Sequence, residues 1–242
     1  MTVSDSSVRI VLLYPDLLGT YGDSGNATIL AKRVALHDIS AEVVLVHSDE
    51  TVTAEGDIYL LGGGEDGPQN YARDLLSKEP NFARAIDKGA LVFAVCAGFQ
   101  ILGDSYVDAR GEIQSGLGVV DAKTRRIKGD RAVGELLGES LLPISQRLLS
   151  GFENHGSGTT LFGRSQPISR TLRGVGNDYD AHVDGALQGN VLCTYMHGPA
   201  LARNYALADY LLEKAVGLKP LEGDWLTELQ MKLLSERIES LS

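Results

Sequence analysis

The sequence predicts an α/β fold, with a mostly parallel central sheet flanked by helices and short antiparallel strands in the second half. Apolar runs at residues 8–14, 41–47, 57–61 and 90–95 alternate with segments of helical pattern. Continuous apolar runs are typical of strands buried on both faces of a parallel sheet, and the alternation of strand and helix indicates βαβ units. In the second half, short apolar segments between glycine turns favour antiparallel pairing.

The composition limits the possible classes of protein. A chain of 242 residues without a repeat or a clear linker is expected to form one domain, residues 1–242. A net charge of -10 argues against general nucleic-acid binding. The apolar runs are too short to span a bilayer, and the polar residues 1–7 do not resemble a signal peptide. Two cysteines cannot form a disulfide framework, so we expect a cytoplasmic protein.

The first strand, residues 8–14, leads into a loop that is dense in turn-forming residues. Open α/β sheets place their sites at this carboxyl edge. Ser24 or Asn26 is expected to cap a helix that runs to about residue 37. For Tyr21 and Asp23, local turn formation and a binding role are both open.

The third strand, residues 57–61, runs into three consecutive glycines, Gly62, Gly63 and Gly64. Glycines let backbone amides approach a ligand closely. A phosphate loop would need a Gly-Lys-Ser/Thr or Gly-x-Gly-x-x-Gly setting that the sequence lacks, and a plain turn rarely needs three glycines. We therefore interpret the run as half of an oxyanion hole, with Gly63 or Gly64 as the donor.

Two helices, expected over residues 68–77 and 81–88, precede an apolar strand that ends at Cys96. Ala94 and Gly98 flank this cysteine, and a helical pattern follows at once. This arrangement resembles a nucleophile elbow with cysteine in place of serine. A thiolate at the start of a helix is stabilised by the helix dipole, and the Ala97 amide would face an oxyanion. The alternative is a buried core cysteine.

The second half contains the predicted short strands 116–120, 132–137, 151–152 and 159–161. A basic segment, residues 123–131, stands out in an acidic protein. It is interpreted either as a solvated hairpin face or as a site that binds a carboxylate-bearing substrate through arginine.

His197 follows a predicted strand, residues 190–196, and precedes a predicted helix over residues 201–216. This placement parallels that of Cys96, which makes His197 the best candidate base, with His155 as the second candidate. Cys193 lies inside the strand pattern and is expected in the core. The cysteines and histidines lack metal-ligand spacing, so no metal site is predicted. Residues 223–242 are expected to form an amphipathic helix, as a packing or partner face.

Cys96, the glycine run and His197 together resemble the class I glutamine amidotransferases, and most closely their cobyric-acid-synthase-like branch. That family has an elbow of the form Gly-x-Cys-x-Gly-x-Gln, which here begins with Ala94 and ends with Gln100. The resemblance implies the flavodoxin-like fold of the class and a Cys96–His197 dyad. It also implies Gln100 as a substrate-binding residue and Gly64 and Ala97 as oxyanion donors. His197 is not followed by the usual x-Glu, and Glu153 is the remaining candidate for a third member.

Within this branch the chain resembles the glutaminase subunits of lipid II isoglutaminyl synthases, through residues 21–26, 61–66 and 126–130. That resemblance implies that L-glutamine is the substrate and that Arg126 binds it, with Arg125 as the alternative residue for this role. It implies no cofactor in this chain. ATP and Mg²⁺ would belong to a Mur-ligase-like partner in a heterodimer, which amidates D-glutamate of lipid II.

Three other functions stay open from the sequence. The chain is alternatively a glutaminase that supplies a cobyrinate-type or pyridoxal-type synthase, a cysteine peptidase with the same elbow, or a non-catalytic binding module. Replacing Arg126 would raise the KM for glutamine only in a glutaminase, and a binding module would tolerate the loss of the Cys96 thiol.

Overall fold

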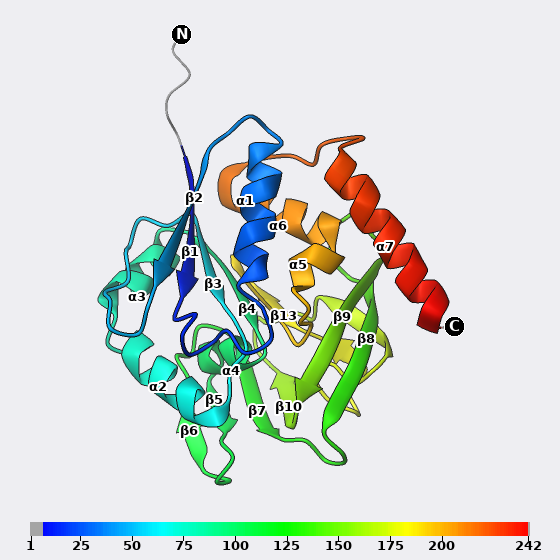
Figure 1. The fold of residues 1–242 in the computed structure, drawn as a ribbon. Helices are drawn as coiled ribbons and strands as arrows, with labels where there is room; N and C mark the ends of the chain where they lie inside the picture. Colours follow the sequence, from blue (N-terminus) through cyan, green and yellow to red (C-terminus); the bar gives the residue numbers. More distant parts are fainter. Residues whose placement is uncertain (1–6, 242) are drawn as a thin grey trace.

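The computed structural model describes residues 7–241 (Figure 1). Most of the polar amino-terminal stretch for which no signal peptide is expected, residues 1–6, lies outside the described residues, as does residue 242 of the predicted tail helix.

A six-stranded sheet forms the centre of the molecule, in the order β13-β14-β4-β3-β1-β2. All neighbouring strands pair in parallel except β13, which is antiparallel to β14 at one edge. The predicted parallel sheet is therefore confirmed. In chain order the strands are β1 (Val8–Leu13), β2 (Ala41–Val46), β3 (Ile58–Leu61), β4 (Leu91–Val95), β13 (Ala186–Gln188) and β14 (Val191–Thr194).

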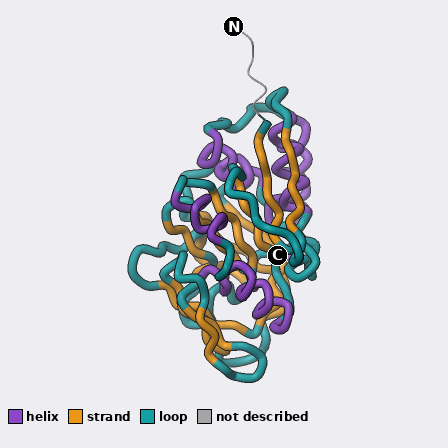
Figure 2. The backbone as a smooth tube through the Cα atoms, turned by 90° about the vertical axis from the view of Figure 1, so that its left-hand side faces the viewer, coloured by secondary structure: helices purple, strands orange, loops and turns teal. Residues whose placement is uncertain are grey.

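Helices flank this sheet on both sides (Figure 2). The connection from β1 to β2 steps one way along the sheet and that from β3 to β4 steps the other way, so right-handed crossovers place their helices on opposite faces. The helices are α1 (Gly25–Ala35), α2 (Asp66–Leu76), α3 (Pro80–Asp87), α4 (Ala97–Leu102), α5 (Ala200–Arg203), α6 (Tyr205–Val216) and α7 (Trp225–Leu241).

Two smaller sheets, in the orders β10-β7-β5-β6 and β12-β11-β8-β9, confirm the antiparallel pairing predicted for the second half. Figure 1 shows the long strands β8 and β9 beside the central sheet. The strands are β5 (Ser105–Val107), β6 (Ile113–Ser115), β7 (Ala122–Arg126), β8 (Ala132–Ser140), β9 (Leu148–His155), β10 (Ser157–Leu161), β11 (Ser169–Arg173) and β12 (Val183–Asp184).

The strand predicted over residues 116–120 is wrong, because this segment folds back onto the end of α4. The amide of Leu117 donates to the carbonyl of Ile101, and that of Val119 donates to the carbonyl of Leu102. Gly118 has a φ of +65°, which a strand does not adopt. The apolar residues of the segment pack locally instead of pairing with a strand.

The helix predicted over residues 201–216 is interrupted at Asn204, which separates α5 from α6. Asn204 has φ -132° and ψ 82°, outside the helical range. Its side chain accepts the amide hydrogen of Ser150 at 2.9 Å and donates to the Ser150 carbonyl at 2.8 Å. These bonds to the start of β9 replace the helical backbone bonds at this point.

Helix α7 confirms the helix predicted in the tail, and a buried arginine from α1 attaches it to the protein. Arg33 is 2% exposed and donates to Asp209 of α6 at 2.7 Å and to Gln230 of α7 at 3.1 Å. Leu226 and Gln230 are the buried residues of α7. A buried charge of this kind is tolerated only when it is paired and hydrogen-bonded.

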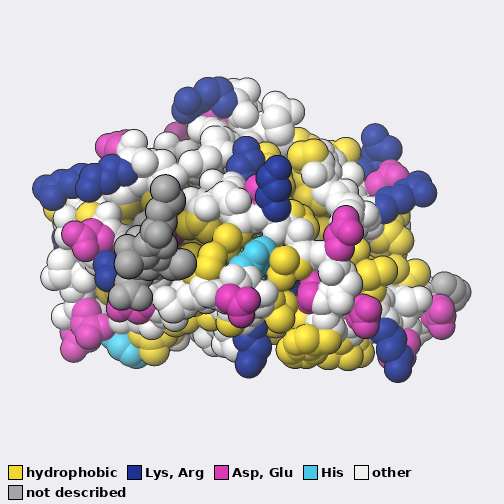
Figure 3. Space-filling view, turned by 90° about the horizontal axis from the view of Figure 1, so that it is seen from above, with side chains coloured by type: hydrophobic (Ala, Val, Ile, Leu, Met, Phe, Trp, Pro, Cys, Tyr) yellow, Lys and Arg dark blue, Asp and Glu magenta, His cyan; other side chains and the backbone are white. Residues whose placement is uncertain are grey.

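On the face seen in Figure 3, basic, acidic and hydrophobic side chains are mixed. Among residues 7–241, no helix combines the length and the apolar character that crossing a bilayer requires.

Candidate active site

Cys96 stands at a strained turn between the central strand β4 and helix α4. All residues of β4 are buried, and Cys96 has a φ of +52° and a ψ of -103°. A residue with a side chain rarely adopts such angles, and this strain is characteristic of functional turns. The Cys96 amide donates to the carbonyl of Thr194 at 2.9 Å, which fixes the turn to the end of β14.

The small residues around Cys96 are required by close backbone packing. The amide of Gly98 donates to the carbonyl of Gly62 at 3.1 Å. A Cβ atom on Gly98 would lie 2.7 Å from the Cβ atom of Leu61. The first turn of α4 can therefore approach the end of β3 only with glycine at this position.

His197 reaches the cysteine because β14 pairs with β4, so that both side chains emerge at the same edge of the sheet. Its backbone is fixed by β9: the His197 amide donates to the Phe152 carbonyl at 2.8 Å, and the Phe152 amide donates back at 3.1 Å. The ring is 1% exposed. Its Nδ1 atom lies 2.9 Å from Oδ2 of Asp23.

The surroundings of the His197 ring favour its protonated form. Burial alone lowers the pKa of His197, but hydrogen bonds to Asp23 and Cys96, and the negative charges of both groups, outweigh it and raise the pKa to about 10. Since Nδ1 faces Asp23, Nε2 is the nitrogen that remains for Cys96. The pair can therefore exist as a thiolate beside an imidazolium, as cysteine nucleophiles require.

Asp23 was not predicted as a catalytic partner, and Glu153 does not take that place. The Glu153 carboxylate accepts the amides of Val175 and Gly176 at 2.7 and 2.8 Å and faces His155 at 3.4 Å. Asp23 is 2% exposed and lies 174 residues from His197 in sequence. The structure thus brings together Cys96, His197 and Asp23 from the segments that follow three different strands, β4, β14 and β1.

The glycine run lies directly beside these three residues. The Gly63 amide donates to Oδ2 of Asp23 at 2.9 Å, and a Cβ atom on Gly63 would lie 2.6 Å from Cε1 of His197. The Gly63 amide is therefore already hydrogen-bonded to Asp23, whereas Gly64 lines the cavity in front of Cys96. Of the two donors considered from the sequence, this arrangement favours Gly64, together with Ala97 of α4.

Tyr21 covers the other side of the histidine. Its ring centroid lies 4.5 Å from that of His197, with 50° between the planes. Its hydroxyl accepts a hydrogen bond from Nδ2 of Asn154 at 3.1 Å. Burial, followed by the negative charge of Glu65, raises the pKa of Tyr21, which keeps the phenol neutral. The loop after β1 therefore supplies two residues to the site.

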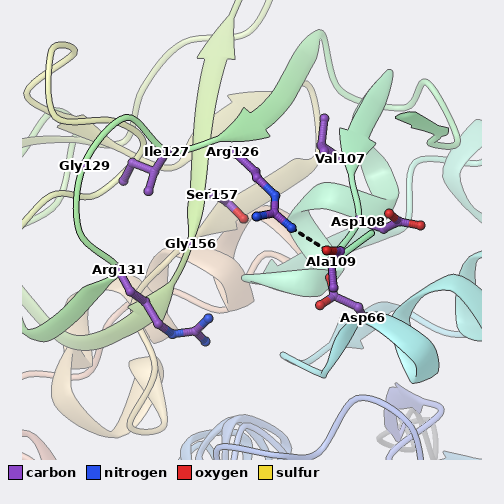
Figure 4. Close-up of a pocket in the computed structure, with 10 residues that line it drawn as sticks. All are labelled: Asp66, Val107, Asp108, Ala109, Arg126, Ile127, Gly129, Arg131, Gly156 and Ser157. Carbon is purple, nitrogen blue, oxygen red and sulfur yellow. Dashed lines mark hydrogen bonds between the residues drawn. The ribbon is translucent and has the colours of Figure 1, made fainter. Parts of the chain in front are cut away.

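A cavity of about 60 Å³ opens in front of Cys96 and adjoins a larger one of about 330 Å³. Gln100 lines the first, and its side-chain amide accepts from Gln69 at 2.9 Å and donates to Ser157 at 2.8 Å. Figure 4 shows the larger cavity. The two share the lining residues Asp66, Arg131, Gly156 and Ser157.

The basic segment contributes to the larger cavity. Arg126 lines it and donates to the carbonyl of Ala109 (Figure 4). Arg125 instead pairs with Asp178 at 2.7 Å and lines other hollows of the surface. Of these two candidates, only Arg126 faces the space next to the cysteine cavity.

Two candidates remain, His155 and Cys193, and His155 also lines the cavity in front of Cys96. His155 is 2% exposed and stacks on Tyr195 with ring centroids 4.0 Å apart. Cys193 is fully buried in β14, as predicted, and burial raises the pKa of its thiol. Among residues 7–241, no group of three or more His, Cys, Asp or Glu side chains is placed to hold a metal ion.

Known proteins resemble this chain in sequence and in fold. The family model of the CobB/CobQ-like glutamine amidotransferase domain matches residues 9–205. The chain is 35% identical over 224 residues to the GatD subunit of lipid II isoglutaminyl synthase (glutamine-hydrolyzing) from Staphylococcus aureus (strain N315), covering 90% of both chains.

The same subunit from Streptococcus pneumoniae (strain ATCC BAA-255 / R6) is 34% identical over 216 residues, covering 88% of this chain and 82% of that protein. A crystal structure of a glutamine amidotransferase superposes with a TM-score of 0.59 at 21% identity, over 86% of this chain and 99% of that one, which supports the fold.

Proposed function

The chain belongs to the family of CobB/CobQ-like glutamine amidotransferases, which are enzymes, and we propose that it is the glutaminase subunit of a lipid II isoglutaminyl synthase. The observation that carries this proposal is the Cys96–His197–Asp23 arrangement beside a cavity, in a chain that matches one such subunit over 90% of both lengths.

The proposed reaction is hydrolysis of the side-chain amide of L-glutamine through a thioester. The Cys96 thiolate attacks the amide carbon, and the Gly64 and Ala97 amides hold the resulting oxyanion. When the C–N bond breaks, His197 gives its proton to the departing nitrogen, which leaves as ammonia. His197 then takes a proton from water, whose oxygen attacks the thioester to release glutamate and restore the thiolate.

The other residues of the site orient these groups. The Asp23 carboxylate accepts the Nδ1 hydrogen of His197, which directs Nε2 towards the sulfur. Arg126 is our candidate for binding the α-carboxylate of glutamine, because it lines the adjoining cavity. Gln100 lies in the wall of the cysteine cavity, where we propose that it forms part of the substrate-binding surface.

The ammonia has to reach an activated acceptor. We propose that a Mur-ligase-like partner binds ATP and Mg²⁺ and activates the α-carboxylate of D-glutamate in the lipid II stem peptide. Ammonia from the glutaminase then yields D-isoglutamine, a step of peptidoglycan synthesis that we place in the cytoplasm. The names of the relatives, which describe subunits of a lipid II isoglutaminyl synthase, support this assignment.

Reconstitution tests the proposal. The chain, a co-expressed Mur-ligase-like protein, ATP, Mg²⁺ and lipid II are incubated with glutamine labelled with ¹⁵N in its side-chain amide. We expect ¹⁵N-amidated lipid II. With Cys96→Ala the label should not transfer, whereas added ammonium should restore amidation, because only the source of ammonia is lost.

Amidation from glutamine by the Cys96→Ala complex would contradict the proposal. Glutamine hydrolysis without amidation of lipid II would instead favour the alternative of a glutaminase for another synthase, such as a cobyrinate-type enzyme.

A further inference from the structure

We propose that Glu153 and His155 form a buried ion pair that positions the wall of the cavity in front of Cys96. The pair acts through Ser157, which holds the side-chain amide of Gln100 in that wall. Glu153 and His155 are positioning residues, since neither takes part in the bond changes at Cys96. Their effect on the reaction rests on the glutaminase function proposed above.

Both ring nitrogens of His155 face oxygen acceptors. Nδ1 lies 3.0 Å from the carbonyl oxygen of Ser157, closer than to the Ser157 amide at 3.4 Å, and Nε2 lies 3.4 Å from Oε2 of Glu153. The ring is buried, and Nε2 has no hydrogen-bond partner among the described residues. A neutral imidazole carries one hydrogen, so one of its nitrogen lone pairs would point at an oxygen. A hydrogen on each nitrogen removes this repulsion, and the geometry therefore favours the imidazolium form.

Glu153 supplies the negative charge of the pair. Its two oxygens accept the amide hydrogens of Val175 and Gly176 at 2.7 and 2.8 Å. Amide donors on both oxygens stabilise the ionised carboxylate. Glu153 is 2% exposed, and a charge buried in this way requires a partner of opposite sign. Within residues 7–241, His155 is the basic side chain that lies at ion-pair distance from it.

The ring of Tyr195 also favours a positive charge on His155. The two ring centroids lie 4.0 Å apart, with 24° between the planes. The face of an aromatic ring carries a negative potential and attracts a cation that lies over it. Tyr195 is fully buried, and its hydroxyl lies 2.6 Å from Oγ1 of Thr159, which fixes the ring. Because Tyr195 belongs to the segment after β14 that carries His197, the ion pair is packed against the same segment as the proposed base.

Ser157 connects the ion pair to the cavity. Its Oγ accepts a hydrogen from Nε2 of Gln100 at 2.8 Å, while Oε1 of Gln100 accepts from Gln69 at 2.9 Å. Both ends of the Gln100 amide are thereby fixed. His155, Ser157 and Gln100 line the cavity in front of Cys96, and Figure 4 shows Ser157 in the wall of the adjoining cavity. The bond from His155 to the Ser157 carbonyl therefore sets the position of a wall against which the substrate side chain would lie.

Nitrogen-15 NMR of the histidine side chains at neutral pH tests the charge of the pair. The signals of His155 are assigned in wild type through scalar couplings between ring and backbone. We expect chemical shifts of protonated nitrogen for both ring atoms. With Glu153→Gln, Nε2 should move to the range of unprotonated nitrogen, while Nδ1 keeps the hydrogen that it donates to Ser157. An unprotonated Nε2 in wild type would overturn the ion pair.

The kinetics of glutamine hydrolysis test the positioning role. His155→Gln and Ser157→Ala should each raise the KM for glutamine about tenfold, the effect of one lost hydrogen bond, because the Gln100 amide is no longer fixed. The value of kcat should change much less, since the reacting groups are untouched. His155→Gln leaves the Glu153 charge buried without a partner. Should that variant not fold, Ser157→Ala, which keeps the pair, gives the measurement.

Two controls separate this effect from a general loss of structure. The stoichiometry of Cys96 labelling by iodoacetamide counts the reactive sites in each preparation, so that kcat is expressed per site. His47→Gln is the matched control, because it makes the same substitution at a side chain that is 47% exposed and lies 3.6 Å from Asp16. It should leave both KM and kcat unchanged.

An unchanged KM in both His155→Gln and Ser157→Ala would overturn the positioning role while leaving the glutaminase intact. If the wild type releases no ammonia from glutamine, alone or with the Mur-ligase-like partner, the glutaminase proposal fails and the positioning role fails with it. The NMR result on the ion pair is independent of that outcome, because it requires no substrate.

Discussion

Oδ2 of Asp23 lies 2.9 Å from Nδ1 of His197 and, at the same distance, accepts the amide hydrogen of Gly63. One carboxylate oxygen therefore joins the loop after β1, the glycine run after β3 and the histidine after β14. This contact makes Asp23 our candidate for the third catalytic group, which the sequence left undecided. It also explains why the ring of His197 is fixed although no glutamate follows it.

Asp23→Asn should lower kcat for glutamine hydrolysis by about 10²- to 10⁴-fold, because the imidazole loses the acceptor that fixes its tautomer. The amide is nearly the size of the carboxylate, so the thermal unfolding temperature should change little. Steady-state kinetics and thermal unfolding of the same preparations check this. A kcat within threefold of wild type would show that Asp23 does not assist His197.

The stability of the protein should depend on pH through His197. Its pKa is raised from the ordinary value of 6.5 to about 10 in the folded protein. The stabilising contribution is therefore fully present below pH 6.5 and is lost as the pH rises to about 10. Urea unfolding at a series of pH values should show a larger loss for wild type than for His197→Gln. Equal losses in both proteins would contradict the assignment.

Gly63→Ala should reduce activity at least tenfold, because the new Cβ atom would lie 2.6 Å from Cε1 of His197 and displace the ring. Gly67→Ala in α2 is the matched control, since no atom lies within 4 Å of its added Cβ. Alanine also favours a helix over glycine by about 1 kcal/mol. The rate of glutamine hydrolysis is measured for both variants. If Gly63→Ala were as active as Gly67→Ala, the contact between Gly63 and the His197 ring would not matter for activity, which contradicts the prediction.

Arg33→Met should destabilise the fold by about 3–5 kcal/mol, because Asp209 would remain buried without its partner. The double variant Arg33→Met/Asp209→Leu should recover part of this loss, since no charge of the pair then remains. Urea unfolding gives the free energies of unfolding. A single variant as stable as wild type would show that the pair does not attach α7 to α1 and α6.

The sequence contained enough to predict the central sheet and to place Cys96 and His197, two of the three groups of the proposed catalytic site, at the ends of their strands. Apolar runs revealed β1, β3 and β4, and the abrupt change of pattern at Cys96 revealed the turn. His197 was found because it follows an apolar strand, as Cys96 does. In each case the signal is local, and parallel pairing of neighbouring strands brings the two residues together.

Asp23 could not be identified in this way because its loop has a sufficient local explanation. Aspartate, serine and glycine are common in turns, and only the folded chain brings Asp23 to His197 across 174 residues. The sequence also gave no clear signal for the interruption of the helix at Asn204, because this interruption depends on hydrogen bonds to Ser150. The segment 116–120 looked like a strand because its apolar residues pack beneath α4.

The different partners of the arginines in the basic segment could not be predicted for another reason. The three arginines have similar sequence surroundings, yet Arg125 pairs with Asp178, Arg126 with the Ala109 carbonyl, and Arg131 with Asn154. Only these tertiary partners distinguish the three arginines.

The most direct test of the account is the release of ammonia from L-glutamine by the purified chain, with and without a Mur-ligase-like partner. We predict release by wild type in at least one of these conditions, a thioester on Cys96 trapped by rapid acid quench, and neither with Cys96→Ala. Ammonia release that persists in Cys96→Ala, or its absence from wild type even with the partner, would contradict the assignment of Cys96 as the nucleophile of a glutaminase.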